Sequence, residues 1–216
     1  MDQIDEYEQG ERVRAWLRNN GSSLIGGVAL GLACLGGWQW WQGQQANEKV
    51  QAAVEFRAFN QALDAGEAAK AEAHATALKQ EHPKSVYPAL AALRQAEALH
   101  GEGKDDEALA ALDTIDRTHL DPMIVELAAL RTARLLLASG KPEEALKRLP
   151  ADGTAAYPSV AAEIRGDAEM ALGRRDAART AYEQALATLD LAAPTRSIVE
   201  MKLTDAGGSP SAQPET

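Results

Sequence analysis

The side chains that could bind a metal or transfer a proton are few and widely spaced. The histidines, which are common metal ligands, show no pair at positions i and i+4 and no neighbouring cysteine. They are His74, His82, His100 and His119. Because a metal site needs several such ligands close together, we expect neither a metal nor another cofactor.

Two acidic runs and one glycine pair resemble catalytic motifs only in part. Carboxylates stand at residues 105–107 and 143–144, where they suit the positive N-terminal end of a helix and need no role in acid–base chemistry. Gly101-x-Gly103-Lys104 has neither the spacing nor the preceding strand of a phosphate-binding loop. No nucleophile elbow or zinc-protease motif occurs. We therefore expect a protein that binds other proteins, with an enzyme as the less favoured alternative.

The composition bounds the fold and the partners. Hydrophobic residues make up 45% of the 216 residues but aromatic residues only 5%, and alanine and leucine carry most of the apolar share. Such a composition favours closely packed helices over sheets, so we predict an all-α protein. The net charge of -10 disfavours a nucleic-acid partner, because phosphate binding needs clustered basic residues.

One segment near the N-terminus predicts a transmembrane helix. Residues 19–47 contain no charge, and residues 24–41 form a nearly unbroken apolar run. As a helix this run would be about 27 Å long, close to the thickness of a bilayer core. Trp38, Trp40 and Trp41 stand at its end, where aromatic rings favour the membrane interface. The lipid bilayer is therefore an expected partner.

The basic residues on either side of this segment predict its orientation. Arg12, Arg14 and Arg18 precede it, against Lys49 and Arg57 after it. By the positive-inside rule the N-terminus is cytoplasmic and the rest of the chain lies across the membrane, the type II arrangement.

Two other interpretations of the segment are less favoured. A cleaved signal peptide disagrees with a long, acid-rich N-terminal region, and a lipoprotein cleaved before Cys34 would need a large apolar residue in place of Gly31. Gly27-x-x-x-Gly31 instead offers a small-residue ridge on which another transmembrane helix could pack.

The remainder of the chain repeats itself. A glycine followed five residues later by an alanine recurs at intervals of 37, 37 and 33 residues, close to the roughly 34-residue period of tetratricopeptide repeats. The pairs are Gly66 and Ala71, Gly103 and Ala108, Gly140 and Ala145, and Gly173 and Ala178. Each glycine stands where one helix must end in a left-handed cap before the next begins.

Prolines and a final apolar segment complete this interpretation. Pro88, Pro122 and Pro158 suit the first turn of the first helix in a pair. Residues 195–203 fit a capping helix, so we predict an α-solenoid of about four helix pairs plus that helix. The predicted domains are a cytoplasmic stub at 1–20, a transmembrane helix at 21–43, a periplasmic repeat domain at 44–205 and a disordered tail at 206–216.

The inner helices of such a solenoid usually form a groove, which gives candidate protein-binding positions. Transferring the groove positions of tetratricopeptide repeats to this sequence gives Asn60, Leu63, Leu93, Glu97, Leu130, Arg134, Glu163 and Asp167. The alternative for each is a solvated residue or one that packs between repeats.

Short motifs in a fixed order give the chain a family resemblance. They are Asn20-Gly21 before a span that ends in Gly37-Trp38, Leu135 to Lys141, Arg165-Gly166-Asp167-Ala168, Leu172-Gly173, Ala177-Ala178-Arg179 and Met201-Lys202-Leu203. In these features the chain resembles the YfgM-type ancillary subunits of the Sec translocon over nearly its whole length. The resemblance implies an inner-membrane protein whose periplasmic repeat domain associates with the SecYEG translocon.

The same resemblance implies a second partner, a membrane-anchored periplasmic chaperone of the PpiD type, with which the protein would handle newly translocated proteins. A cytoplasmic regulator at the N-terminal stub is a further candidate partner. An envelope or cell-division scaffold that uses the same repeats is the alternative function.

Overall fold

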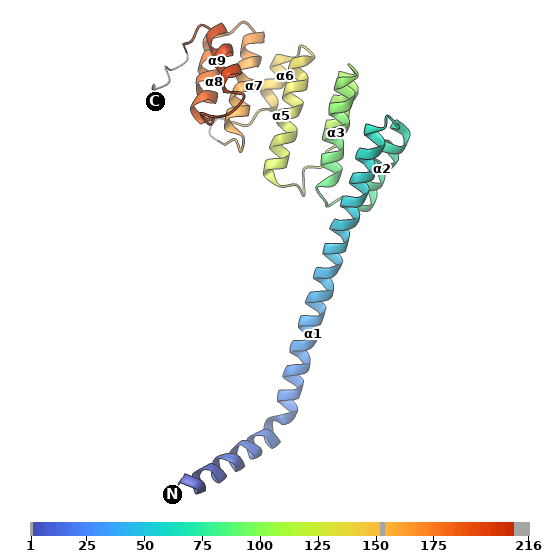
Figure 1. Ribbon diagram of the computed structural model, residues 1–216, viewed down its shortest axis with the longest axis vertical. Coiled ribbons are helices and arrows are strands. Elements are labelled where there is room, and N and C mark those ends of the chain that lie inside the picture. The colour runs from blue at the N-terminus through green and yellow to red at the C-terminus, as the bar shows by residue number, and fades with distance from the viewer. Residues whose placement is uncertain (1, 152–153, 210–216) are drawn as a thin grey trace. The chain divides into compact units, whose positions relative to one another are not determined.

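The structure is a computed structural model that describes residues 2–151 and 154–209, with side chains placed for 14–23, 25–44, 46–151 and 154–209 (Figure 1). Its regular secondary structure within these ranges is entirely α-helical. The prediction of an all-α protein is confirmed. The chain divides into two compact units, Met1–Gln51 and Ala52–Thr216, whereas the sequence suggested a boundary at residue 44.

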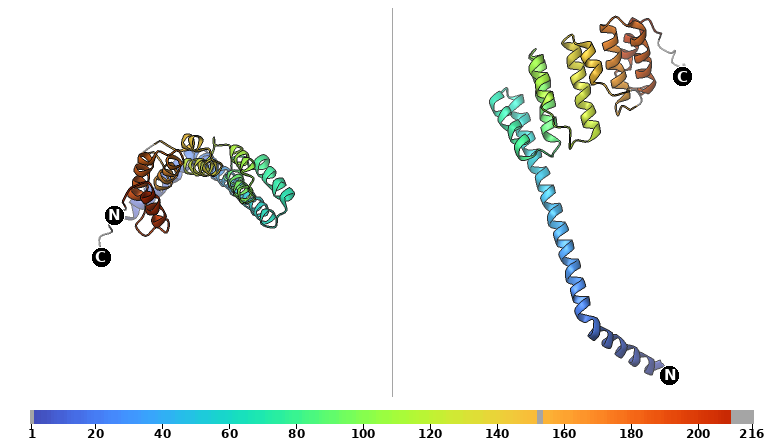
Figure 2. Two further views of the ribbon diagram at one scale, coloured as in Figure 1. Left: turned by 90° about the horizontal axis from the view of Figure 1, so that it is seen from above. Right: turned by 180° about the vertical axis from the view of Figure 1, so that it is seen from behind.

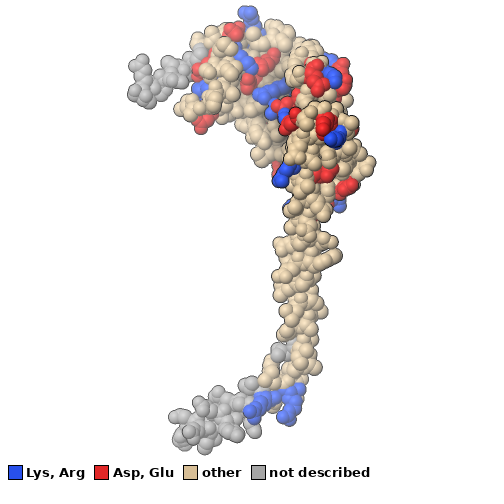
Figure 3. All heavy atoms as spheres, turned by 45° about the vertical axis from the view of Figure 1, so that its right-hand side comes forward, with Lys and Arg blue, Asp and Glu red and all other residues tan. Residues whose placement is uncertain are grey.

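The N-terminal unit is a single helical rod, the first part of α1 (Asp2–Asp64). Its large apolar side chains are exposed, including Ile25 at 72% and Leu30 at 70%, and Figure 3 shows this stretch without charged side chains. Trp38 and Trp41 lie against each other with ring centroids 5.5 Å apart. This unit therefore has no core of its own among its placed side chains.

Length and hydropathy decide whether a helix could span a membrane. Among the described residues no single straight helix qualifies, but helical segments 14–23 and 25–64 qualify as a pair that is bent by 45° between them. The single transmembrane helix at 21–43 stays a prediction.

The second unit contains the end of α1 and eight further helices among the described residues. They are α2 (Ala68–Glu81), α3 (Tyr87–Gly101), α4 (Asp105–Asp113), α5 (Pro122–Ala138), α6 (Pro142–Arg148), α7 (Pro158–Ala171), α8 (Arg175–Thr188) and α9 (Arg196–Asp205). Successive pairs stack along an arc, as Figure 2 shows, and α9 closes the C-terminal end. The predicted helix pairs and capping helix are confirmed.

Each pair turns at a glycine in the left-handed region, as the sequence predicted. The φ angles are 72° at Gly66, 76° at Gly103, 70° at Gly140 and 73° at Gly173. At every one the glycine amide donates to the carbonyl three residues back, and the next amide donates to the carbonyl five residues back. This is the Schellman arrangement, which satisfies carbonyls that a helix end leaves free.

A fifth turn of the same kind follows the capping helix. Gly207 has a φ of 87°, and the amide of Gly208 donates to the carbonyl of Leu203 at 2.9 Å. Ala206 is buried. The cap thus continues into the segment expected to be a tail; residues 210–216 of that segment lie outside the described residues.

Proline and aspartate fix the beginnings of the first helices. Pro122 and Pro158 are the first residues of α5 and α7, and a proline follows the first residue of α3. Asp121 caps α5, because its carboxylate accepts from the amide of Met123 at 2.8 Å. A helix that begins at a proline loses no hydrogen bond, so these starts are well defined.

Four apolar clusters form the core, and each joins one helix pair to the next helix. The cluster around Ala92, Leu112 and Ala128 unites α3, α4 and α5, and the cluster around Ala162, Tyr182 and Val199 unites α7, α8 and α9. The end of α1 packs with α2 and α3 in the same manner, and α5 with α6 and α7. Stability is therefore shared between neighbours, as in other repeat proteins.

Replacing a turn glycine tests this account of the repeats. Beyond the adjacent residues, a Cβ at Gly103 or Gly140 would meet no described atom within 4 Å, so any cost must come from the left-handed backbone rather than from a clash. Gly103→Val is expected to lower the free energy of unfolding by about 1 kcal/mol or more. Gly101→Val is the control, because Gly101 lies at the end of α3 with equal free space and an ordinary φ. Equal thermal unfolding of both full-length variants in detergent would contradict the helix ends described here.

Candidate functional site

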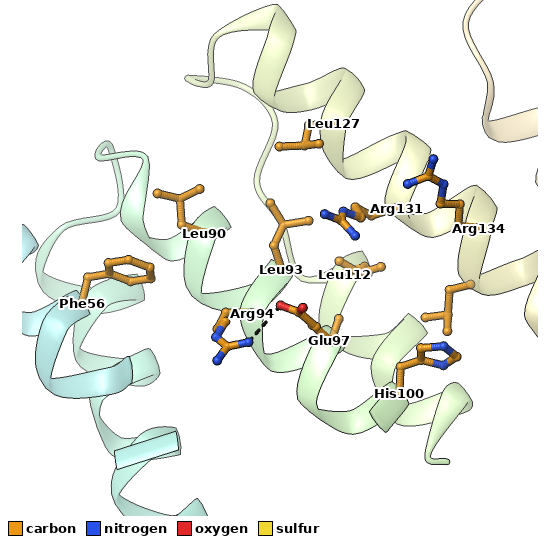
Figure 4. Close-up of a pocket in the computed structure, with 12 residues that line it drawn as sticks. Phe56, Leu90, Leu93, Arg94, Glu97, His100, Leu112, Leu127, Arg131 and Arg134 are labelled. Atoms are coloured by element: carbon orange, nitrogen blue, oxygen red, sulfur yellow. Dashed lines mark hydrogen bonds and ion pairs between the residues drawn. The ribbon is translucent and has the colours of Figure 1, made fainter. Parts of the chain in front are cut away.

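One concavity in the described part of the chain lies between α3 and α5. Its volume is about 420 Å³, and Figure 4 shows the side chains around it. We call it the α3–α5 groove; its lining residues are Phe56, Leu90, Leu93, Arg94, Ala96, Glu97, His100, Leu112, Leu127, Arg131, Arg134 and Leu135. It lies wholly within the second unit, and its size is that of a pocket for a few side chains.

Helical spacing explains why these residues share one site. On α3 the lining residues include positions 90, 93, 94 and 97, and on α5 positions 127, 131, 134 and 135. Both series follow the three- and four-residue steps that place side chains on one helix face. The helices α3 and α5 approach each other less closely than α5 and α7 do, which leaves room for the groove.

The α3 side of the groove is an ion-pair network. Arg94 donates to Glu97 at 3.0 Å and to Asp64, at the end of α1, at 2.9 Å. These two hydrogen bonds, first that to Glu97, raise the pKa of Arg94 above its ordinary value. Because the Arg94 side chain is 41% exposed, the network adds little stability, and its main effect is to hold both charges in place.

The α5 side carries two arginines with much weaker neutralisation. A guanidinium nitrogen of Arg134 lies 3.7 Å from the nearest carboxylate oxygen of Glu163. Arg131 has no hydrogen bond or ion pair with any described residue. The groove thus contains three arginines against one glutamate, in a protein whose net charge is -10.

The structure brings together three of the eight predicted groove residues, Leu93, Glu97 and Arg134. Two others lie nearby without lining the groove. Asn60 donates to the carbonyl of Phe56 at 3.1 Å, and Leu63 packs against the core of the first helix pair.

The prediction that Leu130 lines the groove is wrong, because its side chain lies on another face of α5. It is only 2% exposed and packs in the core between α5, α6 and α7. One residue along a helix turns the side chain by roughly 100°, so the neighbouring Arg131 faces the groove instead. The spacing from Leu127 to Arg131 and Leu135 was the signal that would have identified this face.

Glu163 and Asp167 also lie elsewhere, in a network that fixes α9. Lys202 of α9 donates to Glu163 at 2.7 Å and to Asp167 at 2.8 Å, and the Tyr182 hydroxyl of α8 donates to Asp167 at 2.8 Å. Asp167→Arg would break this network, so it is not a clean probe of binding. Both carboxylates are structural groups here.

Burial and hydrogen bonding have opposite effects on Lys202. Burial alone would lower the pKa of its amine, but the hydrogen bonds to Asp167 and Glu163 outweigh burial and raise it. The pKa of Tyr182 is raised too, first by burial and then by its hydrogen bond to Asp167. The network is therefore strongest with both protons in place.

Replacing Lys202 tests the network. Lys202→Met leaves two partly buried carboxylates without their cation, and we expect about 1–3 kcal/mol lower unfolding free energy near neutral pH. Since the folded-state pKa of Lys202 is raised, the wild-type advantage should be complete below about pH 10.5 and shrink as pH rises above it. Lys147→Met, at an exposed lysine of α6, is the control. If the loss of unfolding free energy in Lys202→Met stays the same at alkaline pH, the stabilisation does not come from the ion pairs of Lys202.

Among the described residues no group of three or more histidine, cysteine, aspartate or glutamate side chains is arranged to hold a metal. The groove chemistry is that of arginines beside leucines, which suits the binding of another polypeptide.

Comparison with known proteins shows which family the chain is similar to. The family model of the tetratricopeptide repeat-like domain matches residues 14–208. An ancillary SecYEG translocon subunit of Escherichia coli strain K12 is 27% identical over 202 residues, which cover 93% of this chain and 96% of that protein. One of Haemophilus influenzae with the same description is 26% identical over 182 residues, covering 84% and 89%.

Proposed function

The chain belongs to the family of tetratricopeptide repeat-like domains, and on that premise we propose that it is an ancillary, membrane-anchored subunit of the Sec translocon. The observation that carries the proposal is the likeness to two ancillary SecYEG translocon subunits along almost the full length of each. It also agrees with the resemblance expected from the sequence motifs. An envelope or cell-division scaffold is less favoured, because neither relative is described as one.

The exposed apolar part of α1 supports membrane anchoring. Leu32 is 65% exposed and Leu35 is 62% exposed on a stretch without charges. Apolar area of this extent needs cover, and a bilayer provides it. With Arg14 and Arg18 before the stretch, we propose an inner-membrane protein with a cytoplasmic N-terminus and a periplasmic repeat domain.

Two surfaces would serve the partners. The α3–α5 groove is the proposed site for a periplasmic protein, either a translocon component or a PpiD-like chaperone that helps newly translocated chains. Gly27 and Gly31 are the proposed contact for a transmembrane helix; beyond the local helix backbone, an added Cβ at either would meet no described atom within 4 Å. A cytoplasmic regulator at the N-terminal stub completes the proposed partners. No catalytic step is part of this function.

Protease accessibility tests the orientation. Protease added to spheroplasts should remove the domain from about Glu48 onward and spare the N-terminal stub, which an antibody against that stub would detect at reduced size. A cytoplasmic protein serves as the control for intact membranes. Protection of the repeat domain until the membrane is lysed would reverse the orientation.

Crosslinking in native membranes tests the partner. A photo-crosslinking residue in place of Leu127, inside the groove, should give adducts with translocon subunits or with a PpiD-like chaperone. The same residue in place of the exposed Glu183 of α8 should give far fewer. Adducts with cell-division proteins alone would favour the scaffold. If Leu127 gives none, Gly27→Leu with Gly31→Leu asks whether co-purification depends on the membrane helix.

A further inference from the structure

We propose that the α3–α5 groove recognises an acidic side chain that is flanked by apolar side chains in an extended segment of a partner protein, and that Arg131 is the residue that binds this carboxylate. The proposal rests on the function proposed above and names the chemistry that the groove selects.

The three arginines of the groove differ in how they are paired. Arg94 is paired with Glu97 and Asp64, and Arg134 has Glu163 at 3.7 Å. Arg131 alone among the three lacks a partner in the described residues. A guanidinium offers several donors in a planar fork that matches a carboxylate, so Arg131 has its full binding capacity available.

Two of these arginines form an unfavourable like-charge pair on α5. Arg131 and Arg134 stand three residues apart on α5, which makes them neighbours on one helix face. Like charges at this spacing destabilise a helix by a few tenths of a kcal/mol. Figure 4 shows Arg131 directed from α5 toward Leu93 and Glu97 of α3, across the groove. An anion bound there would offset the repulsion.

The surroundings of Arg131 distinguish an internal acidic side chain from a chain end. Leu127 lies one turn before Arg131 on α5 and Leu135 one turn after it, and both line the groove. Leu90 and Leu93 face them from α3. Apolar contacts on both sides of the cation suit a polypeptide that continues past its carboxylate in both directions. A free C-terminal carboxylate would leave one side of the apolar lining uncovered.

The charge of the remaining surface makes the site selective. The chain as a whole is acidic, so an acidic segment is repelled except where arginines gather. A basic segment would be attracted to the acidic remainder of the surface and repelled by Arg131 and Arg134 in the groove. Complementarity of this kind determines which partner binds more than how tightly it binds.

The test uses the full-length chain in detergent micelles and a fluorescent peptide, Gly-Leu-Glu-Leu-Glu-Leu-Gly with an amidated C-terminus. A second peptide has glutamine for each glutamate, and a third is this glutamine peptide with a free C-terminal carboxylate. Fluorescence anisotropy measures the Kd. We expect the glutamate peptide to bind about tenfold or more tightly than the amidated glutamine peptide, and to weaken as salt rises.

The variants assign the effect to one residue. Arg131→Gln should weaken binding of the glutamate peptide about tenfold and leave the glutamine peptide unaffected. It should not lower the thermal unfolding temperature, since it removes a like-charge neighbour. Arg175→Gln, at an exposed arginine of α8, is the matched control and should bind as the wild type does. If Arg131→Gln fails to fold, Arg131→Lys is the alternative, because it keeps the charge without the planar guanidinium. Its Kd for the glutamate peptide should lie between that of the wild type and the roughly tenfold weaker value expected for Arg131→Gln.

Four outcomes would each overturn the proposal. Two concern the amidated peptides: equal binding of the glutamate and glutamine peptides, or no binding of any peptide. The others are tightest binding of the peptide with a free C-terminus, and equal losses of binding in Arg131→Gln and Arg175→Gln. The translocon assignment is decided separately. Crosslinks from position 127 to translocon proteins without selective peptide binding would refute only the acidic-segment proposal. Selective peptide binding without such crosslinks would refute only the assignment of a translocon subunit to the groove.

Discussion

The glycine turn that ends each first helix is the constraint on which the repeat domain depends. A left-handed residue at this point lets two successive amides return to the carbonyls of the helix they leave, so the chain reverses without losing backbone hydrogen bonds. Because the same turn recurs at each pair, every second helix leaves its first helix in the same way. Each core cluster can then join one pair to the next in the same way. The groove lies between two successive first helices, α3 and α5, because this arrangement places them side by side.

The stacking of the helix pairs also depends on small residues in the core. Alanine dominates the buried positions, which lets paired helices approach closely. One close approach is at Gly166, where an added Cβ would clash with the ring of Tyr182. Larger residues such as Leu90, Leu93 and Leu127 line the groove between α3 and α5, and Leu93 also packs against the core. The core and the groove therefore share residues, because Ala96, Leu112 and Leu135 belong to the core cluster of α3, α4 and α5 and also line the groove.

The parts of the fold that obey local rules could be predicted from the sequence. The turn glycines and the helix-starting prolines act through their own φ angles and missing amide, and both sets appear where expected. The groove was only partly predictable. Leu93, Glu97 and Arg134 were identified, but Leu130 lies on a neighbouring helix face, and a pattern of repeats does not fix that rotation. Glu163 and Asp167 could not be assigned at all, because their partner Lys202 lies 39 and 35 residues away in sequence.

That distant lysine has a consequence for the groove. Glu163 is the acid nearest to Arg134, and its other oxygen is bound to Lys202 at 2.7 Å. Lys202 of the capping helix therefore holds Glu163 3.7 Å from Arg134, rather than in a close ion pair with it. Since attraction between charges falls with distance and with exposure to water, the positive charge of the α5 arginines is only weakly reduced. The C-terminal cap, which shares no lining residue with the groove, thereby helps to keep the groove positive in an otherwise acidic protein.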